Sequence, residues 1–239
     1  MERMPSEGAR GGGIFARFWA GIGLTCIALL LGATGANAAA KVSAIHGNIA
    51  CVERGKSRVL TRQGRDEGPV LSPDGHTVAF IRVLVKQVPY EVFTKRSALW
   101  VADCRTNAVR QLVASNFSMA DASRNLGDPG DPHFSPDGGF IYFATSAAIV
   151  DSAIHRVNVR TGNERFVAYG GLDLHIFRSG PYRGDILARQ HSCHEEGGCD
   201  YPFYIFTPAG RQVVQIPHSN RWDDRALARW LEANHSQVQ

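Results

Sequence analysis

The sequence lacks the short motifs that carry the commonest enzyme chemistries. It contains no Gly-x-Ser-x-Gly nucleophile elbow, no His-Glu-x-x-His helix and no Gly-x-x-x-x-Gly-Lys phosphate loop. Serine, histidine and aspartate are plentiful, but they do not fall at the spacing of a catalytic triad. We therefore expect a protein that is not an enzyme and that holds no cofactor and no metal.

The sequence also lacks clusters of basic residues. Its 26 Lys and Arg and its 22 Asp and Glu are interspersed, and the net charge at pH 7 is +4. Proteins that bind nucleic acid gather Lys and Arg on one face or along one stripe. The charge pattern is that of an ordinary solvated surface, so we expect no nucleic acid among the partners.

Long apolar runs are rare, and the one that stands out lies near the N-terminus. The stretch "FWAGIGLTCIALLLG" (Phe18–Gly32) follows a weakly basic segment and precedes the small residues Ala36-Asn37-Ala38. This order of charged, apolar and small-residue regions is typical of a secretory signal peptide.

The signal peptide is predicted to cover residues 1–38, with cleavage between Ala38 and Ala39. The mature chain would then be periplasmic or secreted, with no stable membrane span. The alternative is that the segment is kept as an anchor, because Phe18–Ala40 is uncharged and long enough to cross a bilayer.

The tetrapeptide Ser-Pro-Asp-Gly occurs twice, in "VLSPDGHTVAF" (Val70–Phe80) and in "HFSPDGGFIYF" (His133–Phe143), 63 residues apart. Proline at the second position of a turn has its φ already set, aspartate suits the third position, and glycine closes the turn. Apolar and β-branched residues follow both copies. Each copy therefore predicts a tight turn inside a β-hairpin.

A second hairpin follows each of these turns. Ser97–Val113 aligns without a gap against Ser152–Ala168, and weaker copies of the same pattern are Ile49–Leu60 and Phe203–Ile216. Asp173–Gln190 occupies the place of a third Ser-Pro-Asp-Gly hairpin. Units of two hairpins, with four short strands each, predict the blades of a β-propeller.

These segments resemble the repeat of the TolB-type β-propellers. A blade of that family reads roughly as Pro, an aromatic residue, Ser-Pro-Asp-Gly, a strand, a strand with Tyr or Trp, a Thr-Gly turn and Arg-Gln-Leu. The resemblance covers roughly Ile49–Ile216. It implies an all-β fold of about 3.5–4 four-stranded blades, fewer than close a ring in most propellers, in a domain spanning residues 39–218.

The resemblance further implies binding in the periplasm, since such propellers present loops or a central funnel to a protein or a small ligand. We expect an exported, non-catalytic protein-binding or scaffolding module, with a protein partner in the cell envelope or with self-association. One alternative is an accessory or remnant propeller of a peptidase or lyase system. Another is a sensor for a small ligand such as a sugar or a peptide.

Four cysteines remain after removal of the signal peptide, and an even number in an exported protein favours disulfides. Cys193 and Cys199 flank the polar tip "HEEGG", and we predict that they are joined. Free thiols are one alternative. A metal site is the other, because His191 and His194 lie beside the two cysteines, although the spacing is not a standard zinc pattern.

The pairing of Cys51 and Cys104 stays open at this point. The two residues occupy matching strands of successive units, displaced by one position. A displacement of one residue turns a side chain to the opposite face of a strand.

The stretch "GDPGDPHF" (Gly127–Phe134) brings Asp128, Asp131 and His133 close together just before a strand. It is a possible ligand loop, able to hold calcium or to contact a bound molecule. The alternative is an ordinary Pro-Gly connection whose carboxylates face water.

The C-terminal segment 219–239 differs from the repeats. Within "NRWDDRALARWLEANHS" (Asn220–Ser236), Ala226 and Trp230 recur at helical spacing, as do Leu227 and Leu231. The pattern predicts a short amphipathic helix. It would either pack on an open end of the sheet stack and cover a sheet edge, or serve as a docking helix for another protein.

Overall fold

The computed structural model describes residues 40–53, 55–85, 96–118, 121–146, 152–219 and 224–238. All described residues belong to one compact unit, Asn37–Gln239. The predicted cleavage site between Ala38 and Ala39 lies outside the described residues. Within the described part of the chain, no helix is long and apolar enough to cross a membrane.

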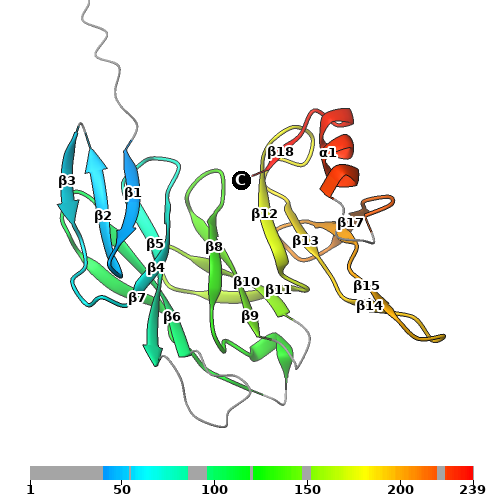
Figure 1. Cartoon of the computed structure of the whole chain (residues 1–239), viewed down its shortest axis with the longest axis horizontal. Coiled ribbons are helices and arrows are strands. Elements are labelled where there is room, and N and C mark those ends of the chain that lie inside the picture. Colours follow the sequence, from blue (N-terminus) through cyan, green and yellow to red (C-terminus); the bar gives the residue numbers. More distant parts are fainter. Residues whose placement is uncertain are drawn as a thin grey trace, which may run out of the picture. The chain divides into compact units, whose positions relative to one another are not determined.

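The described residues form four antiparallel sheets, a two-stranded ribbon, one α-helix and one short 3-10 helix at Ala122–Arg124 (Figure 1). The first sheet contains β1 (Lys41–Ile45), β2 (Asn48–Glu53) and β3 (Lys56–Val59). The second contains β4 (Asp66–Leu71), β5 (Thr77–Val85), β6 (Arg96–Asp103) and β7 (Val109–Val113). The third contains β8 (Gly130–Phe134), β9 (Phe140–Ser146), β10 (Ser152–Asn158) and β11 (Glu164–Tyr169).

The fourth sheet and the ribbon complete the strand inventory of the described chain. In the fourth sheet the order is β17 (Gln212–Gln215), β16 (Phe203–Phe206), β13 (Ile186–Arg189), β12 (Leu172–Ser179) and β18 (Gln237–Val238). The ribbon between β13 and β16 pairs β14 (Ser192–Cys193) with β15 (Cys199–Asp200).

The second and third sheets are simple meanders in which each strand pairs with the next one along the chain. This is the strand order of a propeller blade. The prediction of an all-β fold with repeated antiparallel units and a short C-terminal helix is therefore confirmed at this level. Among the described strands, none of the first sheet pairs with a strand of the fourth.

The two Ser-Pro-Asp-Gly segments are turns that join β4 to β5 and β8 to β9. In the first, the Ser72 hydroxyl donates a hydrogen bond to Asp74 Oδ1 at 2.5 Å and accepts one from the backbone N–H of Thr77 at 2.9 Å. In the second, Ser135 donates to Asp137 Oδ1 at the same distance, 2.5 Å. The serine and the aspartate therefore hold the turn together through local hydrogen bonds.

The first strand of each of the last three sheets carries an irregularity at the same place. The pairing register shifts at Gly68 in β4, at Asp131 in β8 and at Asp173 in β12, and these residues have φ values of 58°, 48° and 51°. Glycine adopts this left-handed conformation freely, and aspartate tolerates it better than most residues. The bulges bend these strands and redirect the neighbouring side chains.

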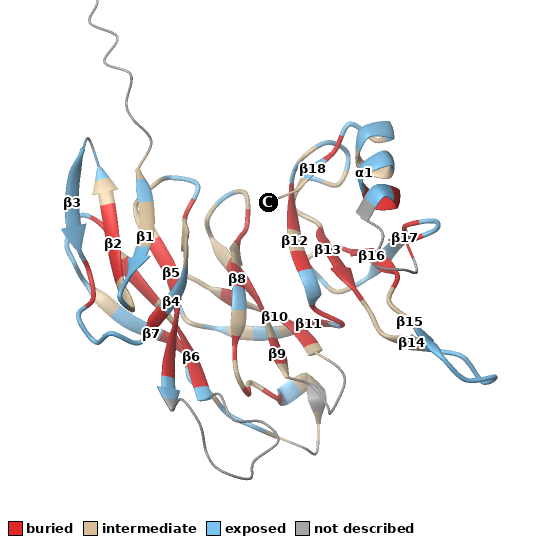
Figure 2. Cartoon of the chain, viewed as in Figure 1, coloured by how far each residue is buried: buried red, intermediate tan, exposed pale blue. Residues whose placement is uncertain are grey.

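The apolar core lies between consecutive sheets, and the buried segments in Figure 2 follow these contacts. Ile49 and Phe80 pack between the first and second sheets. Leu99 and Phe143 pack between the second and third sheets, and Ile176 belongs to the cluster between the third and fourth. Each sheet thus buries a face against its neighbour in the chain.

The helix α1 (Asp224–Ala233) packs on the fourth sheet, and the strand β18 is the last strand at one edge of that sheet (Figure 1). Leu227 and Trp230 pack with Phe177 and Leu187 on a face of this sheet. The helix therefore covers a sheet face, as one of the two interpretations of the sequence expected. Residues 220–223 of the predicted helix lie outside the described residues.

The last residues of the segment assigned to the helix form a strand instead. Val238 is the partner of Phe177 and Gln237 the partner of Ser179, so β18 pairs with the edge of β12. Two residues are too few to show a strand pattern in a sequence, and an unpaired sheet edge is what makes them extend.

Candidate functional site

A cavity of about 400 Å³ lies between the first strands of the second and third sheets. One wall consists of residues 67–70 of β4, and the other consists of residues 128–132 at the start of β8. Glu67 comes from the first wall, and Asp128 and Asp131 come from the second. Two of the three residues of the predicted ligand loop therefore line the cavity.

The local sequence explains why this cavity is lined largely by main chain and rings. Gly68 and Gly130 bring no side chain, and Pro69, Pro129 and Pro132 bring compact rings without an N–H donor. The rest of the described lining consists of the apolar Val70 and Ile81, the hydroxyl residue Ser97 and the three carboxylate residues. The carboxylates are thus the charged groups that the described lining presents to a ligand.

The wall that carries Asp128 and Asp131 is tied to the second sheet. Ser97, a buried residue of β6, donates its hydroxyl proton to the carbonyl oxygen of Pro129 at 2.9 Å. Asp128 itself has a φ of 50°. A hydrogen bond between two consecutive sheets therefore fixes the loop on which the aspartates sit.

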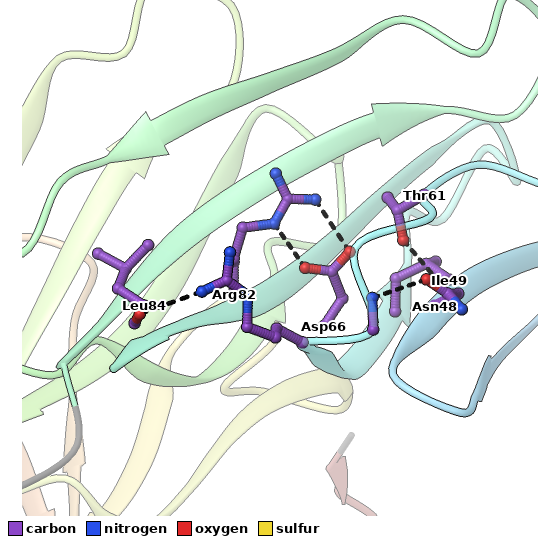
Figure 3. Close-up of polar contacts among 8 residues, drawn as sticks. Asn48, Ile49, Thr61, Asp66, Arg82 and Leu84 are labelled. Carbon is purple, nitrogen blue, oxygen red and sulfur yellow. Dashed lines mark hydrogen bonds and ion pairs between the residues drawn. The ribbon is translucent and has the colours of Figure 1, made fainter. Parts of the chain in front are cut away.

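The wall that carries Glu67 is anchored by the residue before it. Asp66 and Arg82 form a two-point ion pair, with Arg82 Nε 2.6 Å from Oδ1 and Nη2 2.9 Å from Oδ2 (Figure 3). The guanidinium carbon of Arg82 lies 4.2 Å from the centre of the Trp100 ring. β4 is therefore held against β5 and β6 next to Glu67 and Ile81, which line the cavity.

His133 does not line the cavity, unlike the two aspartates predicted with it. Its Nε2 lies 3.0 Å from Asp131 Oδ1, and its ring centre lies 6.1 Å from that of His175 in β12. Its Nδ1 is buried and has no hydrogen-bond partner among the described residues. His133 thus contacts the Asp131 carboxylate without lining the cavity itself.

The position of these residues relative to the strand corrects the sequence analysis. Only Asp128 precedes β8, whereas Asp131 and His133 belong to it. The strand begins early because the bulge at Asp131 lets Gly130 pair with Ala144 of β9. A sequence pattern rich in Gly and Pro does not show this pairing.

Sequence reasoning missed Glu67 and Ser97. A signal for Glu67 was present, because Gly68-Pro69 stands at the same distance before Ser-Pro-Asp-Gly as Asp131-Pro132 does. The repeat itself therefore pointed to β4 as the counterpart of the predicted loop. No local signal marks Ser97, because its role depends on how two sheets pack.

The predicted cysteine pair and the pair that the sequence left undecided both form disulfides. Cys193 and Cys199 are directly opposite each other in the ribbon, with their Cα atoms 4.0 Å apart, and both are exposed. Cys51 of β2 is joined to Cys104, with the Cα atoms 5.9 Å apart, and both are buried. Cys104 follows the last residue of β6, so the alternation of faces along a strand does not govern its direction.

Comparisons with known proteins were made on the sequence and on the structure. No family model matches the chain, and no curated protein sequence matches it. The structure is similar to Porphyromonas gingivalis dipeptidyl peptidase 4, with a TM-score of 0.53 and 11% identity over 76% of this chain and 31% of that one. It is similar to the tricorn protease, with a TM-score of 0.52 and 16% identity over 77% of this chain and 16% of that one.

A third similar structure is TolB from Acinetobacter baumannii, with a TM-score of 0.43 and 17% identity over 69% of this chain and 36% of that one. The chain spans only 36%, 31% and 16% of the lengths of TolB, the dipeptidyl peptidase and the tricorn protease. At these identities the likeness to the two peptidases concerns the fold alone. Together with the blade-like order of the strands, the likeness to the dipeptidyl peptidase and the tricorn protease supports a fold built of repeated antiparallel, blade-like sheets.

Proposed function

We propose that this protein is an exported, non-catalytic protein-binding module, and that a partner docks a basic side chain into the cavity between β4 and β8. The observation that carries the proposal is the meeting of Glu67, Asp128 and Asp131 in one cavity of about 400 Å³. That volume falls within the usual range of ligand pockets, about 300–1,000 Å³. The three carboxylates of the described lining are complementary to a positively charged group.

The non-catalytic part of the proposal rests on the hydrogen bonding of Ser97, which carries the one hydroxyl of the described lining. Ser97 donates its proton to Pro129 O, and the described lining contains no histidine or cysteine. A nucleophile needs a base within hydrogen-bond reach. The Ser97 hydroxyl is bonded to a carbonyl oxygen, which is not a base that could activate it.

The rigidity of both walls supports binding. The ion pair of Asp66 with Arg82 holds one wall, and the hydrogen bond from Ser97 to Pro129 holds the other. A preformed cavity loses little conformational entropy when a ligand enters, which leaves more of the interaction energy for affinity.

Peptide binding to the purified chain tests the proposal. Isothermal titration calorimetry compares peptides that carry one central Lys or Arg with control peptides of otherwise the same sequence. The controls carry norleucine in place of Lys or citrulline in place of Arg. We expect the basic peptides to bind more tightly, and the double variant Asp128→Asn, Asp131→Asn to lose at least about ten-fold in affinity.

Glu53→Gln is the matched control, because Glu53 is an exposed carboxylate on β2, away from the cavity. It should bind as the unaltered chain does. Equal binding of basic and uncharged peptides, or equal affinity in the double variant and the control, would contradict the proposal.

The size of the cavity also favours a second candidate, a sensor for a small cationic or hydroxylated ligand. Thermal-shift screening of free amino acids, dipeptides and sugars separates it from protein binding. A shift that depends on Asp128 and Asp131, without any binding of longer peptides, would favour the sensor. An accessory role in a peptidase system is supported by the likeness of fold to the two peptidases, but by no feature of this cavity.

A further inference from the structure

A second cluster of reactive side chains lies on the ribbon β14–β15, outside the cavity. The donor atoms of His191, Cys193 and Cys199 all lie within 4.8 Å of one another, and Cys193 Sγ is 3.3 Å from His191 Nε2. Figure 1 shows the ribbon projecting from the fourth sheet, and Figure 2 shows its tip as exposed. The cluster is therefore accessible to molecules in solution.

The two disulfides of the chain differ in the property that controls reduction. Cys51 and Cys104 are buried between two sheets, where a reductant has no access, and they lie 53 residues apart in the sequence. Cys193 and Cys199 are exposed, and only 6 residues separate them. Exposed disulfides are the ones that reductants open most easily, and a bridge that closes a short loop stabilises the fold less than one that closes a long loop.

The histidine beside the exposed bridge is held in place by the fold. The ring of His191 stacks on Tyr201, with ring centres 4.9 Å apart and an angle of 17° between the planes. The carbonyl oxygen of Tyr201 accepts a hydrogen bond from Arg189 Nη1 at 3.1 Å, and Arg189 is fully buried. His191 is thus tied to the core although the ribbon projects from it.

The other histidine of the segment is directed elsewhere. His194 Nε2 lies 2.9 Å from the carboxylate oxygen Oδ2 of Asp200. It does not belong to the group of atoms around the sulfurs. Of the four ligands that the sequence offered for a metal, the structure therefore brings together three.

We propose that the reduced ribbon binds a thiophilic metal ion, Zn²⁺ or Cu⁺, through the thiolates of Cys193 and Cys199 and the imidazole of His191. Thiolate and imidazole are the ligands that these ions prefer, and three protein ligands leave a fourth position of a tetrahedral zinc site to water. The disulfide is the metal-free state, because its sulfurs carry no thiolate charge. The ribbon is then a metal site whose availability depends on redox conditions.

The chemistry balances with a dithiol as the reductant. The dithiol gives two electrons and two protons to the Cys193–Cys199 bond, which becomes two thiols, and the dithiol itself becomes a disulfide. Metal binding then releases the two thiol protons, and His191 enters as a neutral imidazole. This proposal does not depend on the function proposed for the cavity.

The first experiment measures selective reduction in the folded, full-length, untagged protein. The protein is titrated with dithiothreitol, quenched by alkylation and mapped by mass spectrometry. We expect alkylation of Cys193 and Cys199 at reductant concentrations that leave Cys51 joined to Cys104. Opening of the buried bridge first, or of both bridges together, would overturn the proposal.

The second experiment measures metal binding to the selectively reduced protein. Co²⁺ is the spectroscopic probe, because thiolate ligands give an intense charge-transfer band, and Zn²⁺ is added in competition. We expect one Co²⁺ per reduced chain, displacement by Zn²⁺, and no binding to the oxidised chain. A reduced chain that stays folded by circular dichroism and binds no metal would refute the site.

Matched variants assign the third ligand. His191→Ala should weaken Zn²⁺ binding at least about ten-fold, because it removes a direct ligand. His194→Ala changes an equally local histidine that pairs with Asp200, and it should leave the affinity unchanged. Equal effects of the two substitutions would show that the structure names the wrong ligand set.

Discussion

Arg82 and Asp66 form a two-point ion pair in which the side chains retain only 6% and 0% of their exposure to solvent. The two residues are direct partners in the pairing of β5 with β4, so the ion pair bridges the first two strands of the second sheet (Figure 3). Trp100 covers the guanidinium of Arg82 from β6. A buried charge pair of this kind makes the fold sensitive to the loss of either partner.

Removal of one partner should therefore destabilise the protein strongly. We expect Asp66→Ala to lower the free energy of unfolding by about 3–5 kcal/mol, because it leaves the Arg82 charge buried without its counterion. Urea unfolding followed by circular dichroism measures the loss. The matched control is Asp121→Ala, which removes the exposed partner of Arg124, 3.4 Å away, and should cost less than about 1 kcal/mol. Similar losses in the two variants would show that burial adds nothing at Asp66.

The Ser-Pro-Asp-Gly turns should make stability depend on acidic pH. The Ser72 hydroxyl, followed by the backbone N–H of His76, holds the pKa of Asp74 below its ordinary value of 3.8. The Ser135 hydroxyl does the same to the pKa of Asp137. Because folding lowers both pKa values, the stability that these carboxylates provide is complete above the unfolded pKa and is lost as pH falls through the folded pKa.

The double variant Asp74→Asn, Asp137→Asn should consequently lose less stability than the unaltered chain when the pH is lowered from about 5 to about 2. Free energies of unfolding measured at a series of pH values give the two slopes. Glu53→Gln serves as the control, because Glu53 belongs to neither turn. Parallel curves for the double variant and the unaltered chain would argue against a role for these two turns.

The packing of α1 on the fourth sheet predicts the cost of losing it. Leu227→Ala should lower the free energy of unfolding by about 2–3 kcal/mol, because Leu227 is buried against the sheet. Arg229→Ala, at an exposed position of the same helix, should change it by no more than about 0.5 kcal/mol. Thermal and urea unfolding measure both effects.

Deletion of residues 221–239 should have a larger effect and should promote association. It exposes the apolar face around Phe177 and frees the edge of β12 that pairs with β18. Size-exclusion chromatography with light scattering detects the association. A truncated chain that remains monomeric and unfolds at the same temperature would mean that α1 and β18 protect nothing.

The export prediction concerns the N-terminus of the protein recovered outside the cytoplasm. We expect this protein to begin at Ala39, because Ala36 and Ala38 fit the narrow subsites of signal peptidase. N-terminal sequencing identifies the first residue. The substitution Ala38→Asp should block cleavage and leave the precursor, whereas exported protein that still begins at Met1 would disprove cleavage at this site.

The features that the sequence alone determined are those whose interactions close over a few residues. The turns at Ser72 and Ser135 are examples, because the hydroxyl and the aspartate that hold them stand two residues apart. The hairpins that follow were predictable for the same reason, since consecutive strands pair with each other. The spacing of apolar residues around Leu227 and Trp230 likewise predicts a helix without reference to the rest of the chain.

Only the tertiary structure decided the features that depend on two sheets meeting. The cavity exists because residues 67–70 and 128–132 face each other across a sheet boundary. The repeat marks these two segments as counterparts, but it does not show that they meet. The disulfide between Cys51 and Cys104 depends on where the turn after β6 directs the Cys104 side chain. The strand β18 forms because the edge of β12 is available for pairing. In each case the decisive contact joins residues far apart in the chain, so its energy is available only after the sheets have packed.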